Sequence, residues 1–217
     1  MRTLVASLVV ALAASSALAG PSLRGVSTGG NVLAPSGIID ESPTPRLGVD
    51  CVVDVSNTLS VDGSGSPNNV VMLVDVAACV GLPSGTPVLF NGIGWDVNLF
   101  ADPAVGTLGG SWLTELAINL GPSAGPGFGY VAPGDDGLGT NQHPGTEHFA
   151  EPVFKIGADL ALPDGVLKME FFEVFNDDAG ADGAWLANST VTIQVVPEPA
   201  SLALCAIGAL ALIRRKR

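Results

Sequence analysis

Trp95–Phe100 reads WDVNLF, and this stretch decides the fold class. Its apolar side chains at Trp95, Val97 and Leu99 are separated by the polar Asp96 and Asn98. Successive side chains of a β-strand point to opposite faces, so a period of two predicts a strand with one buried face. The same period is sought on either side of this stretch.

Trp112–Leu120 (WLTELAINL) repeats the alternation, and we predict a second strand with its apolar side chains opposite Glu115 and Asn119. A helix over residues 112–120 is the alternative, which the flanking glycines disfavour. Leu167–Phe175 (LKMEFFEVF) is apolar enough to be a central strand. Further strand-length apolar runs lie at Val49–Val55, Val70–Val76 and Ser189–Val196, the last with Val191, Ile193 and Val195 on one face. The chain therefore consists of many short strands.

Turn-forming residues separate these strands. The chain has 28 glycines and 16 prolines, and Asp62–Asn69 (DGSGSPNN) has the composition of a turn. No segment between residues 20 and 195 keeps a helical period for long. Seven to nine strands predict an all-β fold, an antiparallel β-sandwich of the jelly-roll kind. A chain of 217 residues is long enough for one such core.

The charge is strongly acidic and unevenly placed. The net charge is −12, and all 21 acidic residues lie between Asp40 and Glu198. Only four basic residues lie between Arg2 and Arg214, so the chain between those two residues carries −17: Arg24, Arg46, Lys155 and Lys168. Nucleic-acid binding requires clustered Lys and Arg against the phosphates, so this composition excludes it.

The first residues have the layout of a secretory signal peptide. Arg2 gives a basic start, Leu4–Ala14 is an apolar run, and Ala17-Leu18-Ala19 is a small-x-small cleavage site. We expect cleavage after Ala19. An uncleaved membrane anchor is the alternative, although the apolar run is short against the roughly 20 residues needed to span a bilayer.

The last residues, VPEPASLALCAIGALALIRRKR, have three parts. Pro197 and Pro199 bracket Glu198 and favour an extended backbone. An apolar run from Ser201 to Ile213 follows, and we assign its larger side chains to a short membrane helix: Leu202, Leu204, Ile207, Leu210, Leu212 and Ile213. A basic cluster closes the chain: Arg214, Arg215, Lys216 and Arg217. Such a cluster stays in the cytoplasm, so residues 20–199 are expected outside the inner membrane.

These three parts resemble the PEP-CTERM sorting domain of Gram-negative bacteria. The resemblance implies an exosortase, a membrane-embedded cysteine protease-transpeptidase, as the partner that recognises Pro197, Glu198 and Pro199. It implies that the apolar helix and the basic cluster hold this motif at the membrane until the tail is processed. The alternative is an ordinary tail anchor that contains Pro-Glu-Pro. Proteins of this kind come from hosts that make exopolysaccharide or biofilm matrix, which makes exopolysaccharide a second expected partner.

The sequence thus divides into four parts. We assign residues 1–19 to the signal peptide, 20–48 to a Gly/Pro/Ser-rich lead-in, 49–195 to the β-sandwich and 196–217 to the sorting signal. The sandwich is expected to be flanked by a signal-peptide helix and a short transmembrane helix. The closing stretch from Asp164 to Gly183 is similar to the end of jelly-roll domains beside secreted proteases, with a glycine, a strand, an Asp-rich loop and a strand.

Cys51 and Cys79 lie in two separate β-branched apolar segments. Export into an oxidising compartment would let them form a disulfide. Two buried free thiols are the alternative, because free cysteine is often fully buried.

Asp177, Asp178 and Asp182 can offer carboxylate oxygens to Ca²⁺, the one cofactor that the sequence suggests. Position twelve of such a loop is Ser189 rather than a bidentate Glu, so an acidic turn is the competing interpretation. His143, Glu147 and His148 lack the spacing of a zinc site, since Pro144-Gly145 breaks any helix that would align them.

No catalytic motif stands out. Gly63-Ser64-Gly65-Ser66 is not a nucleophile elbow, and Glu170 and Glu173 would lie on opposite faces of a strand. We expect a non-catalytic surface or matrix protein that is exported through the inner membrane, transiently anchored and then released to the cell surface or medium. The alternatives are a carbohydrate-binding module, with exposed aromatics among Trp95, Trp112, Tyr130 and Trp185, and a secreted hydrolase.

Overall fold

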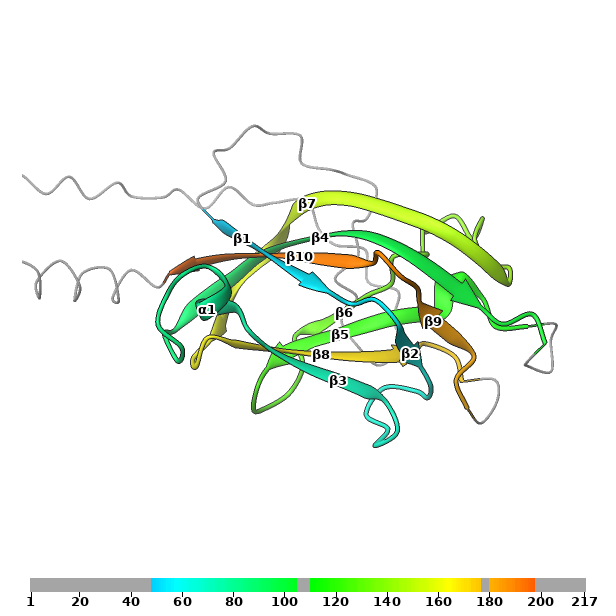
Figure 1. Cartoon of the computed structure of the whole chain (residues 1–217), viewed down its shortest axis with the longest axis horizontal. Coiled ribbons are helices and arrows are strands. Elements are labelled where there is room, and N and C mark those ends of the chain that lie inside the picture. The colour runs from blue at the N-terminus through cyan, green and yellow to red at the C-terminus, as the bar shows by residue number, and fades with distance from the viewer. Residues whose placement is uncertain (1–47, 105–109, 177–179, 198–217) are drawn as a thin grey trace, which may run out of the picture.

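The computed structural model describes residues 48–104, 110–176 and 180–197. Ten strand segments form two antiparallel sheets that pack face to face (Figure 1). The elements are β1 Val49–Asp54, β2 Thr58–Ser60, β3 Val70–Asp75, α1 Val76–Cys79, β4 Val88–Ala101, the 3₁₀ turn η1 Leu113–Glu115, β5 Leu116–Pro122, β6 Gly129–Val131, β7 Gly145–Leu162, β8 Val166–Glu173, β9 Gly183–Trp185 and β10 Thr190–Pro197.

The strand pairing is that of a jelly roll. In one sheet β1 pairs with β10 and β2 pairs with β9. Both β10 and β9 pair with the long strand β4, and β4 pairs with β7. The other sheet has the order β3-β8-β5-β6. The first strands of the chain therefore pair with the last, β3 with β8, β4 with β7, and β5 with β6. This nested pairing is a long hairpin wrapped into a sandwich, so the predicted fold class is confirmed.

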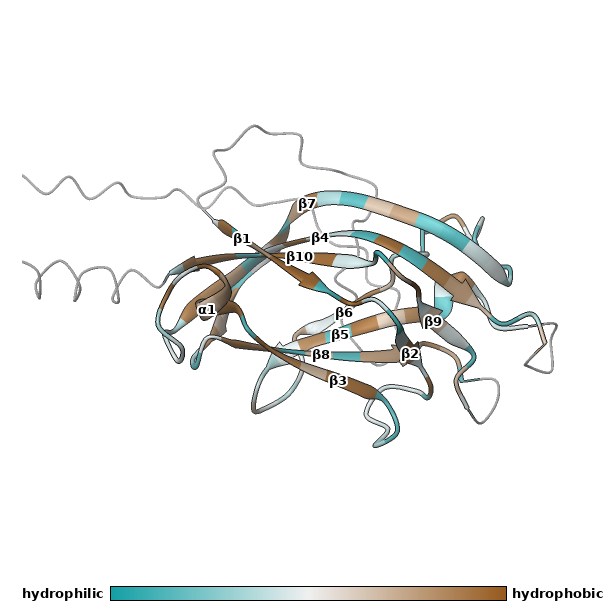
Figure 2. Cartoon of the chain, in the orientation of Figure 1, coloured by the Kyte–Doolittle hydropathy of each residue, from teal (hydrophilic) through white to brown (hydrophobic). Residues whose placement is uncertain are grey.

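The core lies between the two sheets. Its largest fully buried side chains include Trp185, Phe90 and Phe171, and the ring of Phe171 packs edge-on against Trp185 with centroids 5.4 Å apart. In β8 the side chains of Leu167, Met169 and Phe171 alternate into this core. Figure 2 shows the corresponding hydrophobic bands on β4, β5 and β8. The period of two read from the sequence is thus realised in packing.

Most predicted strands form, and one is partly wrong. Residues 112–115 make a 3₁₀ turn, and the strand begins only at Leu116. The backbone N–H of Glu115 donates to the carbonyl of Trp112 (2.9 Å), and the Glu115 carboxylate accepts from the Trp112 N–H (3.0 Å). These local bonds close a turn, which overrides the alternation of side chains.

Strand β7 was not anticipated from the sequence. It pairs with β4 along Gly145–Leu162, but its register shifts opposite Ile93 and Trp95, around Pro152. A bulge and a proline interrupt the alternation of a strand, and both are typical of an edge. The sequence of this 18-residue strand therefore lacks the continuous alternation that would predict it.

The sandwich has two ends of different chemistry. The base is the end formed by the connections 76–87, 122–128 and 163–165, where β1 begins and β10 ends (left in Figure 1). The far end holds the remaining connections, at 55–57, 61–69, 102–115, 132–144, 174–182 and 186–189. Among the described residues, one acidic residue, Asp164, lies in the connections of the base, against six in those of the far end: Asp62, Asp102, Glu115, Asp135, Asp136 and Asp182.

Candidate functional site

The sorting motif continues directly from the last strand. Strand β10 runs to Pro197, which lies opposite Val88 in β4, and Val196 lies opposite Leu89. Val195 is fully buried and Val88 is too. The first proline of Pro-Glu-Pro is therefore part of the folded sheet, at the rim of the base. Glu198, Pro199, the predicted membrane helix and the basic cluster lie outside the described residues, as do the signal peptide and the lead-in up to residue 47.

A disulfide joins β1 to the helix α1 near this rim. Cys51 in β1 is bonded to Cys79 in α1, with their Cα atoms 5.6 Å apart. Asp75 begins the helix by accepting from the N–H of Ala78 (2.8 Å), and this places Cys79 over β1. Hydrogen bonds from Ser84 and Ala78 hold the pKa of Asp75 below its usual value. Of the two interpretations that the sequence left open, the structure has the disulfide.

The base connections are held by polar contacts with one another. Ser123 donates a short hydrogen bond to the Asp164 carboxylate, which lowers the pKa of that group. Gly165 turns with φ +68°, and a Cβ there would stand 2.5 Å from the carbonyl of Thr86 and 2.6 Å from the Cβ of Ala77. Glycine is thus required where the 163–165 and 76–87 connections meet.

At the far end, Glu170 holds the 61–69 connection against the outer face of β8. Its carboxylate accepts from the N–H of Gly65 (2.5 Å) and from the side-chain amides of Asn69 (2.8 Å) and Asn119 (3.3 Å). The Asp62 carboxylate accepts a hydrogen bond from the Ser66 hydroxyl (2.6 Å), among other donors, and these bonds lower the pKa of Asp62. Both carboxylates are used to order a loop.

Glu173 points the other way, into the core, as expected for residues three apart in a strand. Its side chain is 1% exposed, beside Asp182 (2%) and near Glu115 (4%). Burial raises the pKa of Glu173 to about 9, and the carboxyl of Asp182 and the charge of Glu115 add to the rise, while the Ser60 hydroxyl opposes it. Glu173 is consequently protonated at neutral pH. Sequence reasoning missed this group because three segments far apart in the chain supply it.

The predicted calcium ligands fall into two groups. Asp177 and Asp178 lie outside the described residues, and Asp182 is buried beside Glu173. Within residues 48–104, 110–176 and 180–197 there is no cluster of three His, Cys, Asp or Glu side chains fit to hold a metal ion. His143 and Glu147 are exposed and 3.6 Å apart, whereas His148 contacts Asp96 at 2.7 Å. The structure separates these two histidines into different pairs.

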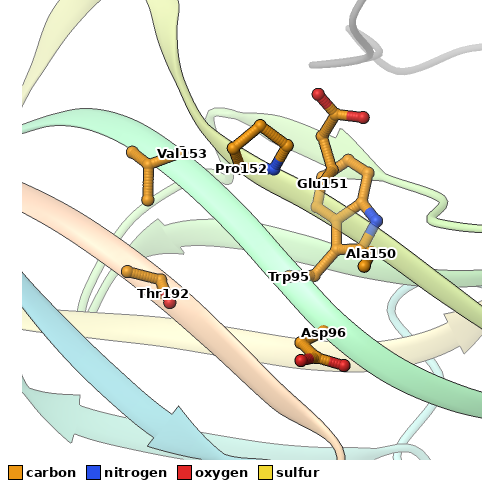
Figure 3. A pocket seen from close by; sticks show the side chains of 7 residues that line it. All are labelled: Trp95, Asp96, Ala150, Glu151, Pro152, Val153 and Thr192. Atoms are coloured by element: carbon orange, nitrogen blue, oxygen red, sulfur yellow. The ribbon is translucent and has the colours of Figure 1, made fainter.

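A shallow hollow of about 300 Å³ lies on the outer face of β4, β7 and β10 (Figure 3). It is lined by Trp95, Asp96, Ala150, Glu151, Pro152, Val153 and Thr192. The β7 bulge makes it, since a Cβ at Gly94 would stand 2.7 Å from the N of Val153. The hollow brings the Trp95 side chain together with the carboxyl groups of Asp96 and Glu151.

The aromatic residues do not form a platform. Trp185 is fully buried and Trp95 is 7% exposed, with its ring edge-on to Phe154. Trp112 and Tyr130 are half-buried, and Tyr130 packs edge-on against Phe172. A flat sugar-binding surface needs exposed rings, and only Trp112 and Tyr130 retain part of theirs.

Comparison with known proteins identifies the tail. The PEP-CTERM protein-sorting motif matches residues 195–217, which include Pro197, Glu198 and Pro199. The chain is therefore an exported protein that carries an exosortase sorting signal. No curated protein sequence matches it. A solved structure similar to this chain is the coat protein of Tobacco streak virus, at 10% identity over 72% of this chain and 91% of that chain, with a TM-score of 0.26.

The matched residues overlap the folded domain. Val195, Val196 and Pro197 belong both to the sorting motif and to β10. Among the described residues there is no helix long and apolar enough to cross a membrane. The expected transmembrane helix belongs to the part of the tail beyond Pro197.

Proposed function

We propose that this protein is a non-catalytic component of the cell surface or extracellular matrix, which an exosortase releases from its membrane tail and which associates with exopolysaccharide. The observation that carries the proposal is the continuity of the sorting motif with β10. Because the motif begins inside the sheet, the tail follows the last strand of the jelly roll directly.

The sandwich suits such a role through its stability rather than through a reactive centre. A disulfide closes a loop of 28 residues at the base, and ordered acidic loops cover the far end. Disulfides stabilise exported domains in the oxidising environment outside the cell. Two of the carboxyl groups on β8 serve the fold: Glu170 holds a loop, and Glu173 is buried with a raised pKa.

Association with exopolysaccharide is tested by co-sedimentation of the mature protein with matrix polysaccharide purified from the native host. We expect the wild-type protein in the pellet and in the matrix fraction of intact cultures. Matched variants separate the faces: Trp112→Ala removes a partly exposed ring, and Trp95→Phe alters the hollow in Figure 3. Retention in the cell envelope with no polysaccharide association would contradict the matrix role and leave the sorting role intact.

A further inference from the structure

The chain between the folded domain and the predicted membrane helix is very short. Pro197 is paired with Val88 at the rim of the base, and the apolar run begins at Ser201. An extended chain advances at most ~3.3–3.6 Å per residue, so these four steps reach roughly 13–14 Å. The headgroup layer of one leaflet takes up about 5–7 Å of that reach, the difference between the whole bilayer and its hydrocarbon core. The base is therefore held within roughly 6–9 Å of the headgroup layer while the tail is inserted.

The charges of the two ends agree with this placement. The base connections 76–87 and 122–128 carry no charged side chain, and 163–165 carries only Asp164. The far end, with its many carboxylates, would be repelled by anionic phospholipid, and this repulsion falls off over about 8 Å at physiological salt. An acidic domain tethered to such a surface lies lowest in energy with its less acidic end down.

The shape of the base also fits a flat partner. Pro83, Ser84 and Gly85 are exposed in one connection, and Ala124, Gly125 and Pro126 are exposed in another. These are small side chains on short turns, which the Asp164–Ser123 contact and Gly165 tie together. Such a surface lets lipid headgroups approach the backbone closely, and the carboxylates of Asp75 and Asp164 there are already held by hydrogen bonds within the base.

We propose that the base of the sandwich is a membrane-contact surface whose partner is the phospholipid headgroup layer. The proposal rests on the sorting tail being inserted in the membrane before it is processed. It means that the Pro-Glu-Pro motif is presented at headgroup level, beneath a domain that stands upright with its acidic far end towards the solvent.

The test uses the full-length, unprocessed chain in vesicles of phosphatidylethanolamine and phosphatidylglycerol that contain a headgroup-labelled quencher and no exosortase. A fluorescent amino acid replaces Ala124 at the base or, as the matched control, Leu138 at the far end, which is 82% exposed. We expect quenching several-fold stronger at position 124 than at 138. Equal quenching at the two positions, or quenching at 124 that requires added exosortase, would overturn the proposal.

A second variant checks the cause. Twenty Gly/Ser residues inserted between Pro197 and Glu198 should abolish the difference between the two positions, because the base is then free to leave the lipid. A difference that survives the insertion would overturn the role assigned to the short connection. Retention of the chain on alkali-washed vesicles reports tail insertion separately, so its loss would contradict the sorting function rather than the contact surface.

Discussion

The two ends of this jelly roll differ in charge. The sorting motif begins at the less acidic end, and the more acidic end faces the solvent. At the base, short turns with few charged side chains, a disulfide and the start of the sorting motif come together within one rim. At the far end, carboxylates order loops or lie protonated in the core. The nested pairing of a jelly roll brings the first and last strands side by side, so both chain ends must leave from the same end. The fold thereby frees the opposite end for contacts outside the cell.

The largest effect is expected for the motif at the rim. Glu198→Ala should leave the precursor at full length in the membrane fraction, because the residue between the two prolines is part of the recognition motif. Asp159→Ala, at an exposed position of β7, is the matched control and should be processed normally. Western blots of membrane and secreted fractions make the comparison. Normal release of the Glu198→Ala protein would show that Glu198 is not needed for recognition of the tail.

Loss of the disulfide is expected to come next. The double variant Cys51→Ser and Cys79→Ser should lose ~3.5 kcal/mol of unfolding free energy, the loop-closure entropy of a 28-residue loop. Urea denaturation of the mature domain measures it. Wild type in a reducing buffer should unfold at the same urea concentration as the variant. A loss below about 1 kcal/mol would show that the base does not depend on this bond.

A smaller loss is expected at the outer face of the far end. Glu170→Ala should cost about 2 kcal/mol, since it removes an ionised acceptor and leaves the amide of Asn69 without that partner. Glu170→Gln, which keeps an acceptor oxygen, should cost less. Proteolysis within the 61–69 connection should increase in the alanine variant. Equal stability of the alanine variant and wild type would show that the loop orders itself.

The smallest effect is stabilising and depends on pH. The pKa of Glu173 is raised from 4.5 to about 9 in the folded protein, so the fold binds more protons than the unfolded chain between those values. Stability should therefore be greatest below pH 4.5 with respect to this group and fall as pH rises towards 9. Glu173→Gln mimics the neutral form and should be more stable than wild type at pH 8, with a higher Tm, and show no gain at pH 4.

Thermal denaturation across pH 4–9 tests this expectation. A Glu173→Gln protein that is less stable than wild type at pH 8 would mean that the buried carboxyl is ionised in the folded protein and that neighbouring groups stabilise its charge. The Glu170→Gln variant serves as the control, because its side chain lies on the opposite face of β8 and should not reproduce the pH dependence.

The fold could be predicted from local patterns where burial alone sets the sequence. β8 and β10 alternate because one face of each meets the core, and their prediction holds. The turn at 113–115 escaped because its cause is a hydrogen bond from the Glu115 side chain, which no hydrophobic period records. β7 escaped because Pro152 and the bulge break its alternation.

The sites divide in the same way. The sorting motif is contiguous, so its residue types and order are visible in the sequence, and the comparison confirms it at 195–217. The buried pair of Glu173 and Asp182 depends on strands brought together only by folding, and each residue alone looks like an ordinary surface acid. That the motif starts within the sheet could not be predicted either, because the register of β10 against β4 sets where the strand ends.

The most direct test of the account is the intact mass of the mature protein from its native host, measured in secreted and membrane fractions. The account predicts a chain that begins at Gly20 and ends near Pro197–Ala200, with or without an added group, in the secreted fraction. A mature protein that retains its tail through Arg217 would contradict it, because the jelly roll would then be a permanently anchored envelope domain.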